Sequence, residues 1–142
     1  MEISEVRRRV QAAMVAARER ARARRERSDE AESAYVGFLD TIAAPLARQL
    51  IGVLKAEGYA FTVSTPGRGL RLSLDRGRDD FVELALQTDG DQPQVIGRIR
   101  RTRGSRTIDE EHPVKPGASP QDLREEDVLE FLARALEPWL ER

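Results

Sequence analysis

Apolar residues recur every three or four positions through the first 57 residues, the spacing of one face of an α-helix. The pattern is densest between Tyr35 and Leu54, where the apolar stripe is too wide to remain in water. Its members are Tyr35, Phe38, Leu39, Ile42, Ala43, Leu46, Leu50, Val53 and Leu54. This half of the segment therefore predicts a helix that packs against the rest of the chain.

The beginning of the same segment has a narrower stripe, with the three-four rhythm typical of a coiled coil. That stripe consists of Ile3, Val6, Val10, Ala13 and Ala17. Continued at the same rhythm, it meets Arg20, Arg24 and Arg27. A long parallel coiled coil is thus unfavourable, because like charges would face each other in its seam.

Two arrangements of residues 2–57 fit this pattern. One is a single helix, and the other is a pair of helices separated by a break near Ser28 and Asp29, where either residue could cap a new helix. Continuity is favoured, because the flanking Ala and Glu residues are good helix formers. Pro45 predicts a kink within the helix, and Gly58 predicts its end.

After Gly58 the hydrophobic period changes from helical to alternating, which predicts strands. Five alternating runs are separated by short turns at 66–69, 75–79 and 88–94 and by a two-residue hairpin at Gly104-Ser105. These connections are too short for parallel crossovers, so the sheet is predicted to be an antiparallel meander of four or five strands.

A last amphipathic helix follows, with Ser119 as its predicted N-cap and Pro138 as its predicted end. The fold class is therefore α+β: a long or bipartite N-terminal helix, the meander, and a C-terminal helix packed with the N-terminal helix on the sheet. The predicted domains are a charged helical extension at 1–33 and an α+β globular domain at 34–142.

The charges nearly balance over the chain, with 24 basic and 25 acidic residues, but they are unevenly distributed. Residues 1–27 contain nine Arg and four Glu, a balance of +5, whereas residues 107–142 contain four basic and ten acidic residues, a balance of −6. The acidic end is therefore a potential complement for the basic helix, in the same chain or in a second copy.

The sequence gives little support to catalysis or to a cofactor. It has no Cys and a single His, His112, so zinc would lack the three or four ligands that it requires. The paired carboxylates, such as Asp79 with Asp80, are explained as turn residues that bond to their own backbone. We therefore expect no enzyme, no cofactor and no metal. Neither a secretory signal nor a run of membrane-spanning length is recognised, so a cytoplasmic location without membrane contact is expected.

Clustered arginines are the features that most suggest a function. One group lies in the N-terminal helix, and another lies on and after the fourth strand, where Arg98 and Arg100 are predicted to pair with Glu83. Such clusters can bind phosphates without reading bases. The candidate nucleic-acid-binding residues are Arg20, Arg24, Arg27, Arg98, Arg100, Arg101, Arg103 and Arg106. A solvated or internally paired charged surface is the favoured interpretation, because the chain is not basic overall.

The principal functional hypothesis is a protein-interaction or assembly module that acts through its N-terminal helix, as a homo-oligomer, in particular a dimer, or with another protein. The apolar start of that helix has no evident place on the globular domain. The candidate partner-binding residues are Ile3, Val6, Val10, Met14, Arg18, Arg22 and Arg25. Sequence-nonspecific nucleic-acid binding is the alternative, and a site built only from carboxylates is the remaining route to an enzyme.

Overall fold

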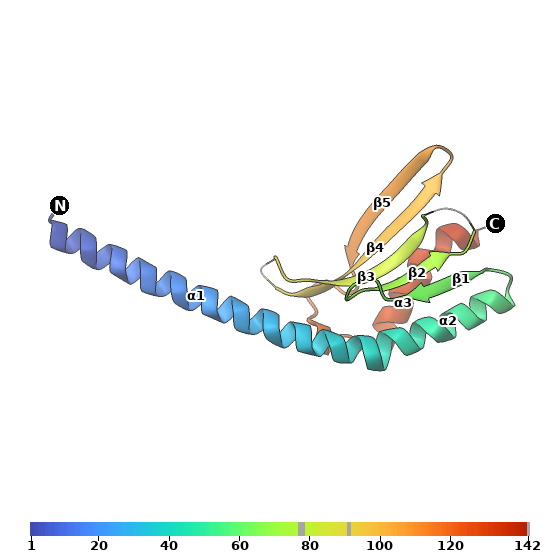
Figure 1. The fold of residues 1–142 in the computed structure, drawn as a ribbon, viewed down its shortest axis with the longest axis horizontal. Coiled ribbons are helices and arrows are strands. Elements are labelled where there is room, and N and C mark those ends of the chain that lie inside the picture. The colour runs from blue at the N-terminus through green and yellow to red at the C-terminus, as the bar shows by residue number, and fades with distance from the viewer. Residues whose placement is uncertain (77–78, 91, 142) are drawn as a thin grey trace. The chain divides into compact units, whose positions relative to one another are not determined.

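The computed structural model describes residues 1–76, 79–90 and 92–141 (Figure 1). The chain forms two compact units, Met1–Glu30 and Ala31–Arg142. Helix α1 (Ile3–Phe38) is continuous through Ser28 and Asp29, so the first of the two predicted arrangements is correct there. Ala, Arg and Glu dominate this stretch, and all three have a high helix propensity.

The predicted kink at Pro45 is present as one wide turn. A π-helical turn, η1 (Leu39–Ala43), separates α1 from α2 (Ala44–Ala56), and the amide of Ala44 donates to the carbonyl of Leu39. Pro45 has no amide to offer the carbonyl of Thr41, which explains why the regular ladder is interrupted here. Gly58 ends α2 with a φ of 92°, and the Tyr59 amide donates to the carbonyl of Leu54, as in a Schellman cap.

The five strands form one antiparallel meander in the order β1-β2-β3-β4-β5. Their bounds are β1 (Phe61–Ser64), β2 (Leu70–Leu74), β3 (Phe81–Gln87), β4 (Gln94–Arg103) and β5 (Arg106–Pro113). Arg103 pairs with Arg106, which confirms the two-residue turn at Gly104-Ser105. Residues 77 and 78 of the predicted 75–79 turn, and residue 91 of the 88–94 turn, lie outside the described residues. The predicted α+β fold class is confirmed.

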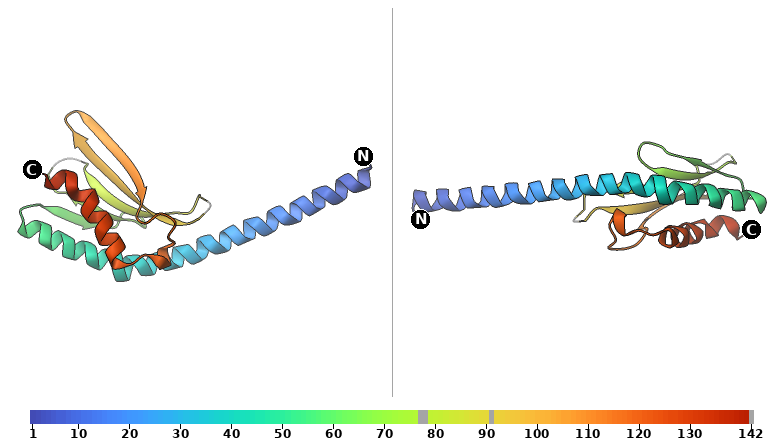
Figure 2. Two further views of the ribbon diagram at one scale, coloured as in Figure 1. Left: turned by 180° about the vertical axis from the view of Figure 1, so that it is seen from behind. Right: turned by 90° about the horizontal axis from the view of Figure 1, so that it is seen from below.

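One face of the sheet carries the core. Cross-strand register places Leu70 opposite Leu84 and Leu72 opposite Val82, and all four side chains are fully buried. Side chains from α2 and from α3 (Glu125–Leu140) complete the same apolar cluster, and Figure 2 shows these two helices side by side. Burial of these side chains, at about 1.5–3 kcal/mol each, is the main stabilising contribution.

The C-terminal region differs from its prediction at both ends of the helix. Ser119 precedes a single 3₁₀ turn, η2 (Pro120–Asp122), and α3 begins only at Glu125, where the Asp127 carboxylate accepts a hydrogen bond from the Arg124 amide. Pro138 lies inside α3, which continues to Leu140. The predicted N-cap and end of the final helix were therefore wrong. Leu123 is buried in the core with an extended backbone, and it separates the η2 turn from α3.

The helical segment Ile3–Ala56 contains an 18-residue window with a mean hydropathy of 1.2, long and apolar enough to cross a membrane by length and composition. The expectation that no such stretch exists was wrong by this measure. Residues of the same segment, including Leu46, Ala47 and Leu54, belong to the core of the second unit.

Candidate interaction surfaces

The first unit exposes an apolar helix face. Ile3 is 78% exposed, Val10 is 52% exposed, and Val6 and Met14 are each 45% exposed. Their spacing puts them on one side of α1, because residues three, four or seven apart share a helix face. These are the four apolar residues predicted to bind a partner, and the structure groups them on one surface.

Arginines follow this face along α1, in the second half of the unit. Arg22 forms ion pairs with Glu19 and Glu26, and hydrogen bonding to Glu19 followed by the charge of Glu26 raises the pKa of the guanidinium above its usual value. Among the described residues the other arginines of this stretch form no ion pair. They are Arg18, Arg20, Arg24, Arg25 and Arg27.

The strand arginines do not form one patch. Arg98 and Arg100 lie on one face of β4, and Arg101 and Arg103 alternate with them on the other face, because successive side chains of a strand point to opposite sides. Arg106 lies across the hairpin from Arg103. The predicted cluster is therefore divided between the two faces of the sheet.

The acids of β5 neutralise the first pair. Arg100 Nε lies 2.8 Å from an Asp109 carboxylate oxygen, and Arg98 Nε lies 3.9 Å from Glu111. Hydrogen bonding raises the pKa of Arg100 and lowers that of Asp109 from their usual values. The register of β3 and β4 places Glu83 opposite Arg98, as predicted, but among the described residues no ion pair joins Glu83 to Arg98 or Arg100. The two arginines pair with the acids of β5 that lie opposite them.

Glu83 instead pairs with Arg71 of β2, with both carboxylate oxygens 3.3 Å from the guanidinium. The three arginines of this sheet face gather over one aromatic ring, since the guanidinium carbons of Arg71, Arg98 and Arg100 lie 4.1, 5.8 and 5.5 Å from the ring centroid of Phe81. Phe81 is only 5% exposed as a result. The three arginines shield this apolar ring on the otherwise polar face of the sheet, and each also forms an ion pair with an acid of β3 or β5.

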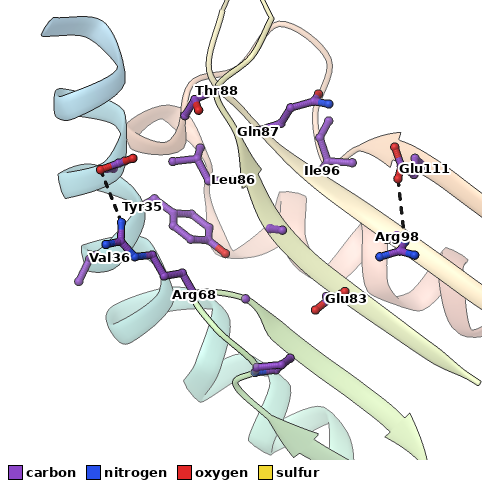
Figure 3. A pocket seen from close by; sticks show the side chains of 14 residues that line it. Tyr35, Val36, Arg68, Glu83, Leu86, Gln87, Thr88, Ile96, Arg98 and Glu111 are labelled. Carbon is purple, nitrogen blue, oxygen red and sulfur yellow. Dashed lines mark ion pairs between the residues drawn. The ribbon is translucent and has the colours of Figure 1, made fainter. Parts of the chain in front are cut away.

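A hollow of about 410 Å³ lies where the end of α1 meets the sheet (Figure 3). Tyr35 and Val36 line it from α1, Leu86 lines it from β3, and Arg68 of the β1–β2 turn lies 3.6 Å from Glu32 across it. The Tyr35 hydroxyl donates to the carbonyl of Leu84 at 3.3 Å, so this phenol is already engaged in the fold. The charged groups that line the hollow are all in ion pairs: Arg68 with Glu32, Arg98 with Glu111, and Glu83 with Arg71, which lies outside the lining.

A groove of about 660 Å³ lies between α3 and the β4–β5 hairpin. Glu110 and His112 line it, with His112 Nε2 3.8 Å from Glu110, while Asp109 and Glu111 lie on the opposite face of β5. No group of three His, Cys, Asp or Glu side chains suited to a metal ion occurs in the part of the chain that the structure describes. The sequence did not predict this groove, because it needs residues of β5 and α3 to face each other across loop 114–124.

Asp80 also differs from its prediction. It is 5% exposed and accepts hydrogen bonds from the Thr102 amide at 2.8 Å and from Trp139 Nε1 at 3.0 Å. The interpretation of Asp80 as a turn residue bonding its own backbone was therefore wrong. Its carboxylate joins the end of α3 to β4.

The chain matches no family model, and comparison with curated proteins and with solved structures finds no similar protein. The fold is an α+β meander sheet with helices packed on one face.

Proposed function

We propose that this protein is a non-enzymatic assembly module that self-associates through the apolar face of its N-terminal helix. The observation that carries the proposal is the exposure of Ile3, Val6, Val10 and Met14 along one side of α1. A continuous apolar surface in water is unfavourable by about 25 cal/mol per Å², and such surfaces typically mark interaction sites.

The arginines near this face have a second role in the proposal. Arg18, Arg22 and Arg25 lie C-terminal to the apolar residues and carry positive charge onto the partner surface. Charges at the margin of an interface set orientation and association rate more than affinity. The acidic C-terminal segment of a second copy, with a balance of −6 over residues 107–142, would attract these arginines, so self-association is expected to be faster at low ionic strength.

The test is light scattering on the full chain and on a variant with Val6→Gln and Val10→Gln. Glutamine keeps the helix propensity and removes the apolar contact. The control is Val15→Gln, since Val15 is 66% exposed but lies about 100° round the helix from Met14. We expect an oligomer for the natural chain and for the control, and a monomer for the double variant. A monomeric natural chain at micromolar concentration refutes the proposal.

Sequence-nonspecific nucleic-acid binding is a second candidate, supported by the arginines of residues 18–27 that form no ion pair among the described residues. It predicts strongly salt-dependent binding to DNA or RNA. Replacing Arg20, Arg24 and Arg27 by Gln is expected to weaken binding. Replacing Arg98 and Arg100, which are paired with acids, is expected to have a smaller effect. Fluorescence anisotropy at low salt measures both, and undetectable binding of the natural chain eliminates this candidate.

A further inference from the structure

The groove between α3 and the β4–β5 hairpin is an apolar trough with a charged rim. Ile99 of β4 and Val114, just after β5, line it on one side, and Phe131, Ala135 and Pro138 of α3 line it on the other. Its volume of about 660 Å³ lies in the range of pockets that hold a ligand. An apolar groove beside a helix is suited to the apolar face of a second helix.

The rim of the groove carries three acids, Glu110, Asp127 and Glu130, and two basic residues, Lys115 and Arg134, a balance of −1. Lys115 lies 3.7 Å from Asp127, and Arg134 lies 3.3 Å from Glu130. Over its whole length α3 contains five acids and one Arg, a balance of −4. A ligand that complements this surface is apolar on one face and carries positive charge on its flanks.

The N-terminal helix has these two properties. Its apolar residues Ile3, Val6, Val10 and Met14 follow an i, i+3, i+7, i+11 pattern, the anchor spacing of helices that bind in grooves. Residues 1–27 carry a balance of +5, from nine Arg and four Glu. The chain therefore contains both a groove and a helix of complementary charge and polarity.

Pairing of two N-terminal helices with each other is a weaker solution. The apolar seam ends after Ala17, and the next positions at the same rhythm are Arg20, Arg24 and Arg27. Two heptads are fewer than the three or four that a stable coiled coil typically needs. The groove instead offers walls that are already packed into a folded core.

We propose that the groove of one copy binds the apolar face of residues 3–14 from a second copy, with each copy contributing one helix and one groove. This inference rests on the proposed self-association and specifies the surface that the helix contacts. The N-terminal helix and α3 carry opposite net charges and attract each other across the interface, so the contact weakens as salt increases.

The chain has no Cys, which permits a cross-linking test with single thiols. One sample carries Val10→Cys on the helix, and a second, differently tagged sample carries Arg134→Cys on the groove rim, where the Arg134 side chain is 76% exposed. The two are mixed and treated with a short bismaleimide. We expect a heterodimer that contains both tags, which an intramolecular contact cannot produce.

Two controls place the thiol at exposed positions off the proposed surfaces. Val15→Cys replaces the helix thiol, and Leu129→Cys, at a residue 43% exposed and outside the groove lining, replaces the rim thiol. Both controls are expected to cross-link at least tenfold less. Unchanged thermal unfolding of each variant shows that the folds are intact.

The outcomes separate the two proposals. In one outcome the Val6→Gln, Val10→Gln variant is monomeric, and Val10→Cys cross-links only to a second Val10→Cys chain. The N-terminal helices of two copies then pair with each other, so the groove inference is wrong and self-association stands. Equal linking in the controls also overturns the inference. A natural chain that scatters as a monomer, together with Val10→Cys and Arg134→Cys samples that form no tagged heterodimer, refutes both proposals.

Discussion

At the scale of single residues, Asp80 is the clearest case of a side chain whose role depends on distant partners. Thr102 and Trp139 are 22 and 59 positions away in the sequence, yet both donate to its carboxylate. Buried donors that lose their acceptor destabilise a fold, because water no longer compensates them. This makes Asp80 a structural residue of the described core.

The first prediction concerns this carboxylate. Asp80→Ala is expected to lower the free energy of unfolding by about 1.5–3 kcal/mol, since two donors lose a charged acceptor. Urea unfolding measures the loss, and emission from Trp139, the only Trp of the chain, reports the change at its indole. The control is Asp79→Ala, at an exposed neighbour, which is expected to change stability by less than about 0.5 kcal/mol. Equal effects of the two variants would contradict this role.

The second prediction concerns Tyr35, which is 2% exposed. Burial, followed by the negative charge of Glu83, raises the pKa of its phenol to about 12 from an ordinary value of 10.0. As the pH rises, the Tyr35 phenol ionises in the unfolded chain before it ionises in the folded chain. The stabilisation linked to its raised pKa is therefore complete below pH 10 and is lost as the pH rises toward 12. A titration followed by phenolate absorbance should show one late step in the natural chain, the ionisation of Tyr35 near pH 12.

Tyr35→Phe provides the comparison for that step. The variant is expected to lose the late titration and to be less stable near neutral pH by about 0.5–1.5 kcal/mol, the range for one hydrogen bond. Its stability should also fall less between pH 10 and 12. A late step that persists in the variant would assign the raised pKa to another group.

At the scale of elements, local sequence predicted the strands, the hairpin turn and the position of the helix kink. The form of that kink, a π turn at Leu39–Ala43, was not predicted. Pro45 explains why the ladder must be interrupted, but a Pro kink can be absorbed in more than one way. Burial of Phe38, Ala43 and Leu46 in one cluster is consistent with the wide turn, which keeps their side chains on the core side.

The third prediction concerns the contact between β4 and α3. A Cβ at Gly97 would collide with the ring of Phe131, so only Gly permits this approach of helix and strand. Gly97→Ala is expected to lower stability by about 1–3 kcal/mol through overpacking, and adding Phe131→Leu should recover part of the loss. Gly37→Ala is the control. It lies in α1 with open space around it and is expected to stabilise the fold by about 0.5–1 kcal/mol.

At the scale of the whole molecule, self-association couples stability to concentration. If only the folded chain oligomerises, mass action raises the midpoint of thermal unfolding as protein concentration increases. The fourth prediction is that this dependence is present in the natural chain and in Val15→Gln and absent in the Val6→Gln, Val10→Gln variant. Scanning calorimetry over a hundredfold range of concentration measures it. A midpoint independent of concentration in all three chains would contradict self-association.

Local patterns of residues predict the order and kind of the elements. Alternating Leu and Val positions indicate the strands, and an apolar stripe with a period of 3.6 residues indicates the helices. Gly58 marks the end of α2, and Gly104-Ser105 marks the turn between β4 and β5. These signals can be recognised from sequence because they act within a few residues. The sequence also identified the apolar residues of the N-terminal helix that the structure leaves exposed.

Contacts between side chains from distant segments depend on the tertiary structure. It paired Arg100 with Asp109 and Arg71 with Glu83, buried Asp80 beneath Trp139, and formed the groove between α3 and β5. Register and packing between distant segments set these contacts, and a one-residue change of register reverses the face of every strand side chain. Local pattern therefore predicts which surfaces exist, whereas packing determines which charges remain available to a partner.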